Sequence, residues 1–475
     1  MSFNFLKISK FFLYLVPFSV VIVSLGTIFP FIVAKAVFFR AVIDLALIFY
    51  VLHWAFGATT PMRNNSDKNV NKLLPLWRQP LVISVMIFTF FYILSGFFGI
   101  NSDYSFWSNF ERGEGGFQIL HLFIFFFLLV QIFKEEKEWH RLFITSASAA
   151  MLMISYGIGA GLKWANFIGP DFCNRFQGSL GNPAYVGTYL LFSIFYSGYL
   201  FIKEQVNIKK WCWGILLVVF AFFLLLTQTR GAFMGAGVGF IFFASYMAFV
   251  LPSGWLKKIS SGGAILAIIF GGVVILFKPN LNPLPFCSTA GRLLEISISN
   301  ATFQTRFWTW GSAISGWKDR PLFGWGPENF TEVFDRYFDT RHFNPNAVSE
   351  TFFDRAHSIY FDYLAQTGIL GLLSYLLIFA VFFWQFFKKV NSKKEIGNNN
   401  SQKLTLITDY RLSIANALLF ALPIAYLVQG LVLFEVLPIY INLFLFLAFA
   451  NWKLTTKYEK NTNIQNYKNG KGDSQ

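Results

Sequence analysis

One histidine in this chain has a type and a position that could carry chemistry. His357 stands in FFDRAHSIYFDYLAQTG, residues 352–368, at the head of a predicted short helix between a long polar loop and an apolar run. A histidine titrates near neutral pH, so it can take a proton from a hydroxyl group. Asp354 could orient the imidazole or could instead cap the helix. Because a lone histidine is more often structural than catalytic, the groups placed around it decide the interpretation.

Three arginines could bind an anion on the same side of the chain as His357. Arg230 lies in the tight turn TQTRG between two apolar runs, and Arg306 lies in a stretch with aromatic residues at helical spacing. Arg175 comes shortly before GSLGNP, residues 178–183. A guanidinium group holds a phosphate by paired hydrogen bonds. The alternative is that these side chains only extend to the lipid headgroups.

The sequence predicts neither a metal site nor a cofactor. It contains no HxxH, HExxH, DxD or paired-cysteine pattern, which are the spacings that place metal ligands close together. The three cysteines, at positions 173, 212 and 287, have no metal-ligand spacing and are too few for a disulfide framework. The chemistry is therefore expected to use side chains alone.

The composition is typical of a membrane protein with many spans. Hydrophobic residues make up 55% of the chain and charged residues 13%, and the mean hydropathy is +0.51. Apolar runs long enough to cross ~30 Å of hydrocarbon recur from end to end, the first over residues 11–33. The expected fold class is an all-α polytopic membrane protein of about twelve transmembrane helices, with a large helical extracytoplasmic loop between spans nine and ten.

The distribution of positive charge predicts the orientation. Lys and Arg are concentrated in alternate connections, which indicates that both termini are cytoplasmic. These loops also account for the net charge of +15, so no nucleic-acid partner is expected. We expect a nine-span region (1–277), an extracytoplasmic catalytic loop with short helices (278–368), three C-terminal spans (369–450) and a disordered cytoplasmic tail (451–475).

The connection 278–368 is far longer than an ordinary loop and is not composed like a disordered one. Aromatic residues at helical spacing between positions 302 and 317 predict a helix along the membrane surface. LFGWGPENF then gives a turn, and Pro327 is expected to open a second helix. Gly368 is expected to end the helix that His357 leads. The other histidine on this side is His342.

At these residues the chain resembles the O-antigen ligase-like superfamily of bacterial envelope proteins, which also includes O-antigen polymerases and O-linked protein oligosaccharyltransferases. The resemblance covers most of the chain and is sharpest between Gly178 and Gly371. It rests on four stretches in this order: GSLGNPAYVGTYL, TQTRGAFMGAGVGF, RFWTWGSAISGWKDRPLFGWGPENF and HSIYFDYLAQTGILG. Relatives often have asparagine where this chain has Ala184, directly after Gly-Asn-Pro. Each motif is weak alone, but their order is specific.

The resemblance implies transfer of a glycan from an undecaprenyl-pyrophosphate carrier to an acceptor hydroxyl in the bacterial cytoplasmic (inner) membrane, without a metal or a nucleotide sugar. His357 matches the proposed general base, and Arg230 and Arg306 match the arginines taken to bind the pyrophosphate. Arg175 and Arg320 match less closely. The acceptor would be a glycolipid of the lipid A–core type, a glycan or a protein. One base without a second carboxylate suits a direct, inverting displacement.

Other functions stay open at this point. A polymerase or a protein O-oligosaccharyltransferase would share the donor chemistry of a ligase and differ only in the acceptor. A small-anion transporter is the alternative from a different class, although transporters usually keep ionisable groups near the membrane midplane. The main charges inside the early spans are Arg40 and Asp44, four residues apart, which we expect to form an ion pair within one helix.

Overall fold

The computed structural model describes residues 4–56, 75–109, 112–170, 175–277, 301–343, 351–396 and 405–455, and every regular element in these ranges is a helix. The α-helices are α1 (Phe5–Leu15), α2 (Val33–Phe56), α3 (Pro80–Phe98), α4 (Ser102–Trp107), α5 (Gly116–Ile132), α6 (Glu136–Gly161), α7 (Pro183–Lys203), α8 (Asn207–Leu226), α9 (Arg230–Val250), α10 (Trp255–Phe277), α12 (Ala301–Asp319), α13 (Phe330–Arg336), α14 (Ile359–Ile396), α15 (Thr405–Gln429) and α16 (Leu437–Thr455). Short 3₁₀ turns are η1 (Val16–Val21), η3 (Leu76–Arg78), η4 (Gly178–Leu180) and η5 (Thr340–His342).

The all-α membrane fold that the sequence predicts is confirmed. In the described ranges, ten helices are long and apolar enough to span a membrane, and α5 is a shorter apolar helix. The expected first span differs, because α1 already begins at Phe5 and the chain changes to 3₁₀ geometry at Val16. Pro17 lacks the N–H that would continue the α-helix, which accounts for the change. The chain next becomes α-helical at Val33.

The helix α16 forms the centre of the bundle. Nearly all of its span, 94%, is buried, and it packs against α5 and α7. The opposite case is α10, which packs mainly on α9 and has only 6% of its span buried. In a bilayer the exposed faces of such helices contact lipid.

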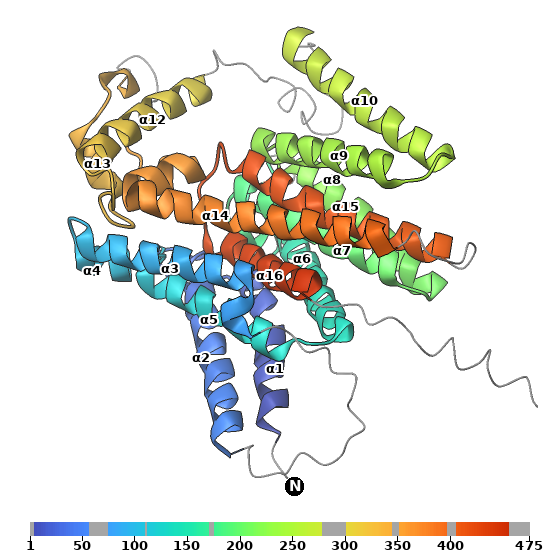
Figure 1. The fold of residues 1–475 in the computed structure, drawn as a ribbon. Helices are drawn as coiled ribbons and strands as arrows, with labels where there is room; N and C mark the ends of the chain where they lie inside the picture. Colours follow the sequence, from blue (N-terminus) through green and yellow to red (C-terminus); the bar gives the residue numbers. More distant parts are fainter. Residues whose placement is uncertain are drawn as a thin grey trace, which may run out of the picture.

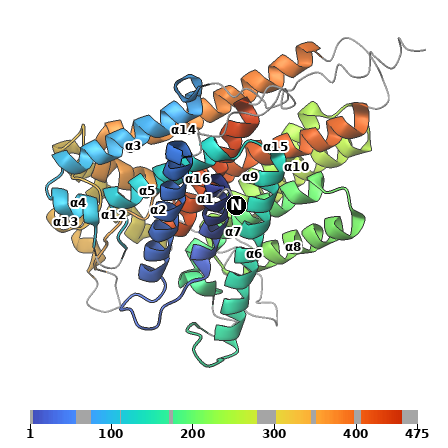
Figure 2. The same cartoon turned by 90° about the horizontal axis from the view of Figure 1, so that it is seen from below.

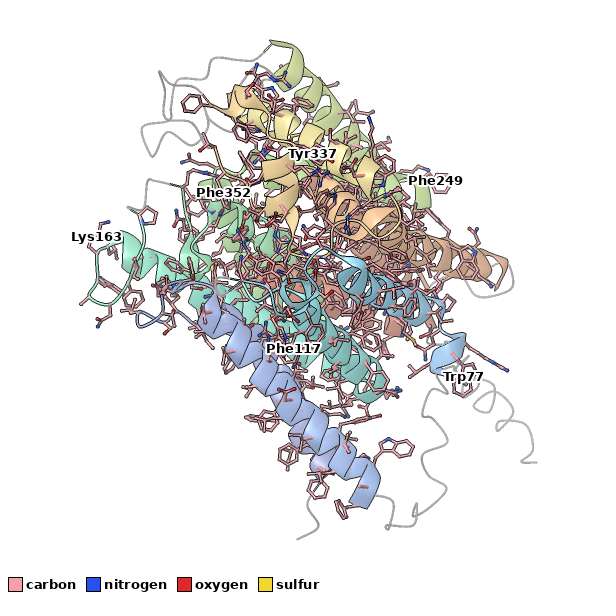
Figure 3. All side chains as sticks on the ribbon, turned by 90° about the vertical axis from the view of Figure 1, so that its left-hand side faces the viewer. Trp77, Phe117, Lys163, Phe249, Tyr337 and Phe352 are labelled. Carbon is pink, nitrogen blue, oxygen red and sulfur yellow. The ribbon has the colours of Figure 1, made fainter. Side chains whose placement is uncertain are left out.

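The helices of the long connection lie beside α4 at one end of the molecule. The helices α4, α12 and α13 gather there, where α3 ends and α5 and α14 begin (Figures 1 and 2). Figure 3 looks onto this end, with Tyr337 beside α13 and Phe352 in the segment that leads to α14. The short loop 430–436 between α15 and α16 also contributes to this end, because the backbone N–H of Ile359 donates to the carbonyl of Gly430 (2.9 Å).

The long connection contains the two helices that its sequence predicts, with one shifted start. The aromatic stretch forms α12, whereas α13 begins at Phe330 rather than at Pro327. Glu328 has a φ of +68°, which is incompatible with a helix, so Pro327 and Glu328 remain in the turn. Residues 278–300 and 344–350 of the expected catalytic loop, and 456–475 of the expected tail, lie outside the described residues, while α16 continues to Thr455.

Gly368 breaks α14 as the sequence predicts. Its φ of +65° separates a short helical segment, which starts at Ile359, from the long span that follows. A Cβ atom at this position would lie 2.3 Å from the carbonyl oxygen of Leu322, so only glycine fits here. After the break, the backbone N–H of Ile369 donates to Pro321 (2.9 Å), which ties the span to the end of the α12 segment.

Candidate active site

His357 lies two residues before α14 rather than inside the helix. Its φ of +53° is unusual for a non-glycine residue. The backbone on both sides is fixed: the Ala356 N–H donates to the Asp362 carboxylate (2.7 Å), and Ile359 donates to Gly430. These contacts hold the chain in a sharp turn, and the turn rather than a helix presents the imidazole.

The imidazole of His357 is oriented by a backbone carbonyl. Its Nδ1 lies 3.1 Å from the carbonyl oxygen of Arg355. A carbonyl only accepts hydrogen bonds, so Nδ1 carries the proton of the neutral ring and Nε2 keeps a free lone pair. The rings of Phe353 and Phe434 flank the imidazole edge-on, with centroids 5.3 and 5.1 Å away. The geometry is that of a base with one defined acceptor atom.

Charged groups from three parts of the chain act on His357. Its pKa is lowered to about 4, mainly by burial, and the guanidinium charges of Arg306 and Arg112 contribute to this decrease. The hydrogen bond to the Arg355 carbonyl and the charge of Asp354 oppose this shift. The imidazole is therefore neutral at physiological pH, which is the state a general base requires.

Asp354 does not bind the imidazole in the way the sequence allowed. Its carboxylate lies 2.7 Å from the guanidinium of Arg112, which sits between α4 and α5. That guanidinium also stacks over the Phe434 ring, 4.9 Å from its centroid. Arg112 was not a predicted site residue, yet it shares Phe434 with His357.

A buried ionic cluster is formed by Arg355, two residues before His357 in the chain. The Arg355 guanidinium is paired with Glu328, with Glu114 (3.5 Å) and with Asp362 (3.7 Å), and all four side chains are buried. Burial alone would lower the pKa of Arg355, but the three carboxylates raise it well above its usual value. The arginine therefore stays charged, and breaking such a pair typically costs about 3–5 kcal/mol.

The GWGPENF turn holds one wall of this cluster. The backbone N–H of Glu328 donates to Gln366 (2.5 Å), and the Glu328 carboxylate accepts from Ser108 (2.6 Å). Trp325 and Gly326 donate their backbone N–H groups to residues 365 and 366 of α14 (3.0 and 2.8 Å). The motif therefore joins the α12 segment to α14 and aims Glu328 at Arg355.

The aromatic ring of Phe434, in loop 430–436, connects the site to α7. Tyr185 packs against this ring (5.9 Å between centroids), and its hydroxyl interacts with the Arg112 guanidinium. Tyr185 belongs to the GNPAY motif, in which Asn182 caps α7 by accepting from the Ala184 N–H (2.8 Å). This motif thus fixes the start of α7, so that Tyr185, the third residue of the helix, contacts Phe434.

Arg230 and Arg175 flank a different side of loop 430–436. Arg230 is the first residue of α9, and a Cβ on Gly231 would lie 2.5 Å from Val432 of that loop. Arg175 donates from Nε to the Thr227 carbonyl in the same turn (3.4 Å). Both predicted arginines thus lie at the end of the bundle where His357 lies, but Arg306 is the predicted arginine whose charge acts on the imidazole.

The comparison with known families agrees with this arrangement. Residues 215–376 match the family model described as O-antigen ligase, a region that runs from α8 to α14 and includes Arg230, Arg306 and His357. This match supports membership of the O-antigen ligase-like superfamily and a glycan transferase of the O-antigen ligase or polymerase type. No curated protein matches the chain.

Arg320 of this O-antigen ligase-like protein is placed differently from the other predicted arginines. Its guanidinium donates to the carbonyl of Phe98 (3.1 Å) and stacks on Trp325 (5.5 Å). These contacts join the end of the α12 segment to the end of α3. They fit a structural role for Arg320.

Two further expectations are settled by contacts. His342 is buried among aromatic rings that include Trp308, Phe334 and Phe353, and burial lowers its pKa, so it belongs to the packing of this segment.

The expected ion pair between Arg40 and Asp44 is wrong. Arg40 donates to Gln118 (2.7 Å) and to the Gly113 carbonyl, and Asp44 lies 3.2 Å from His121. Arg40 therefore pairs with a residue of α5 and with the loop just before it, and Asp44 pairs with a residue of α5.

The residues that sequence analysis missed share one property, which is that their partners are distant in the chain. Arg112, Glu114 and Glu328 are ordinary loop charges by pattern, and only the fold brings them to residues 354–362. The clue available in the sequence was the density of charge in short outer connections of an otherwise apolar chain. In the described ranges, no group of three His, Cys, Asp or Glu residues is arranged to hold a metal ion.

Proposed function

We propose that this protein transfers a glycan from an undecaprenyl-pyrophosphate carrier to an acceptor hydroxyl, as an O-antigen ligase does. His357 is the general base, and Arg306 and Arg230 bind the pyrophosphate. The observation that carries the proposal is the His357 imidazole, which is held through Nδ1 by the Arg355 carbonyl and on which the charge of Arg306 acts. It lies at the end of the bundle that we assign to the outer face of the bacterial inner membrane, with both termini cytoplasmic.

The proposed reaction is a direct displacement. The acceptor hydroxyl attacks the anomeric carbon, its proton passes to Nε2 of His357, and the bond to the pyrophosphate oxygen breaks with inversion. Negative charge grows on the leaving pyrophosphate, and preorganised guanidinium groups stabilise it. The aromatic rings beside His357 keep water from the base, which limits hydrolysis of the donor.

Donor binding also improves the base. The guanidinium charge of Arg306 lowers the pKa of His357 in the empty site. A bound pyrophosphate neutralises that charge, so the pKa of the imidazole rises toward the value at which a base is most effective. The base is thus strengthened only when the donor is present.

The test is substitution of His357 by alanine or glutamine in a glycan-transfer assay with full-length protein in proteoliposomes. Loss of a general base typically lowers the rate by about 10²–10⁴-fold, and we expect both variants to show a loss in this range. The matched control is His342→Gln, which changes a histidine of the same segment that is buried among the rings of Phe334 and Phe353. Near wild-type transfer by His357→Gln would refute the assignment.

The acceptor distinguishes the alternatives within the superfamily. Loss of a ligase leaves long unattached polymer on the carrier, whereas loss of a polymerase leaves single repeats. A protein O-oligosaccharyltransferase would instead lose the glycan on a protein. We favour a glycolipid acceptor of the lipid A–core type, and the length of carrier-linked glycan in a deletion strain tests this choice.

A further inference from the structure

Arg112 has the placement of a substrate-binding cation, although no sequence motif pointed to it. Its guanidinium lies on the face of Phe434, a ring that also packs against His357. Its charge acts on the His357 imidazole, as that of Arg306 does. Arg112 and Arg306 approach the imidazole from different elements, the α4–α5 connection and α12.

The ion pair that holds Arg112 leaves part of its hydrogen-bonding capacity unused. The NH2 group binds the Asp354 carboxylate, but Nε is buried and has no hydrogen-bond partner within the described residues. A buried donor without a partner is costly unless a ligand completes it. The Asp354 side chain retains 26% of its exposure, against 10% for Arg112, so the carboxylate is the more solvent-accessible partner.

We propose that Arg112 is a third pyrophosphate-binding residue and that Asp354 is the counter-ion it exchanges for the donor. In the empty site the Asp354 carboxylate neutralises Arg112. When the donor binds, two pyrophosphate oxygens take over the guanidinium, including its unused Nε. This inference rests on the proposed function, because it names a further residue of the same donor site.

The exchange has a second consequence for the same site. Asp354 comes three residues before His357, and its charge raises the pKa of the imidazole. Once the carboxylate leaves Arg112, it is free to stabilise the imidazolium that forms when His357 takes the acceptor proton. Asp354 therefore neutralises Arg112 while the site is empty and stabilises the His357 imidazolium when the donor is bound.

The experiment measures binding of undecaprenyl pyrophosphate to full-length protein in nanodiscs, with undecaprenyl phosphate as the comparison lipid. Loss of a hydrogen bond to a charged group costs about 1.5–3 kcal/mol, so we expect Arg112→Gln to weaken pyrophosphate binding about tenfold or more and Arg112→Lys to weaken it less. We expect Asp354→Asn to tighten binding while lowering kcat, because the competing anion and the support of the imidazolium are both removed.

The signs of these effects separate the possible explanations. A misfolded protein cannot bind more tightly, so Asp354→Asn distinguishes exchange from structural damage. The control is Arg341→Gln, which breaks an exposed arginine–aspartate pair (2.5 Å to Asp339) in the same long connection and should leave binding unchanged. If wild-type protein does not prefer the pyrophosphate lipid, the proposed function fails. If it does, but Arg112→Gln binds equally well or Asp354→Asn binds more weakly, the exchange is refuted.

Discussion

At the scale of single residues, the site is governed by how His357 is surrounded. Its turn conformation fixes the tautomer through the Arg355 carbonyl, and its pKa responds to charges on three separate segments. The sequence motifs singled out His357 and Arg306, and the structure brings the Arg306 charge to act on the His357 imidazole. The sequence could not predict the Arg112–Asp354 pair, because the two residues are separated by 242 positions and neither lies in a periodic pattern.

The first prediction at this scale concerns pH. The charged groups that act on His357 are Arg306 from α12, Arg112 from the α4–α5 connection and Asp354 from its own segment, and the backbone carbonyl of Arg355 accepts from its Nδ1. A general base at His357 would need the neutral imidazole, and kcat/KM reports the free enzyme, in which this pKa is lowered to about 4. We therefore expect no loss of kcat/KM from His357 between pH 7 and pH 5, and a loss only as the pH falls through about 4.

The pH profile of kcat should differ, because it reports the donor complex. The bound pyrophosphate neutralises Arg306, so the acid limb of kcat should lie at higher pH than that of kcat/KM. Steady-state rates at saturating and limiting donor in nanodiscs measure both. An acid limb in kcat/KM near the ordinary histidine value of about 6.5, absent in the His357 variant, would contradict this account.

At the scale of elements, the GWGPENF turn connects α12 to α14 and holds Glu328 against Arg355. The helical spacing of α12 and the break at Gly368 were predictable from pattern, since both follow local rules. The start of α13 was not, because the carboxylate of Glu328 is held in the turn by Arg355, a tertiary contact that overrides the preference of Pro327 for a helix start.

The second prediction tests this turn with two glycines. Gly326 has a φ of +94°, and a Cβ there would lie 2.5 Å from Ser105 Oγ and 2.9 Å from Gly99 Cα. Gly326→Ala should therefore destabilise the fold by about 1–3 kcal/mol and reduce transfer, because the turn must shift. The control is Gly311→Ala in α12, where a Cβ meets nothing within 4 Å and should stabilise the helix by roughly 0.5–1 kcal/mol.

Thermal unfolding of both variants in detergent measures the stability change, and the transfer assay measures the effect on the site. Equal melting temperatures for Gly326→Ala and wild type would show that the turn tolerates a side chain. A drop for Gly311→Ala would indicate that the surface of α12 is covered by another segment.

At the scale of the whole molecule, composition and length were sufficient to predict an all-α membrane fold, because about 20 apolar residues in a row have few other structures available to them. They could not predict which helix forms the centre. The helices α16 and α10 have the same mean hydropathy over their spans, 1.4, yet one is almost fully buried and the other almost fully exposed. Packing order depends on tertiary contacts that hydropathy does not encode.

The third prediction tests the orientation of this bundle. Lys163, after α6, is exposed and expected outside, whereas Lys209, at the start of α8, is exposed and expected in the cytoplasm. In a background without the native cysteines, Lys163→Cys should react with a membrane-impermeant maleimide in spheroplasts, and Lys209→Cys should react only after the membrane is opened. The reverse pattern would invert the topology and place His357 in the cytoplasm.

The buried cluster around Arg355 also sets the order in which the enzyme becomes active during its biogenesis. Glu114 enters the membrane early in synthesis, but its cation follows 241 residues later, and the Leu437 N–H that it accepts comes 323 residues later. The buried cluster is therefore complete only when the start of α16 is in place. If the proposed function holds, we expect a chain truncated before Leu437 to lack transfer activity.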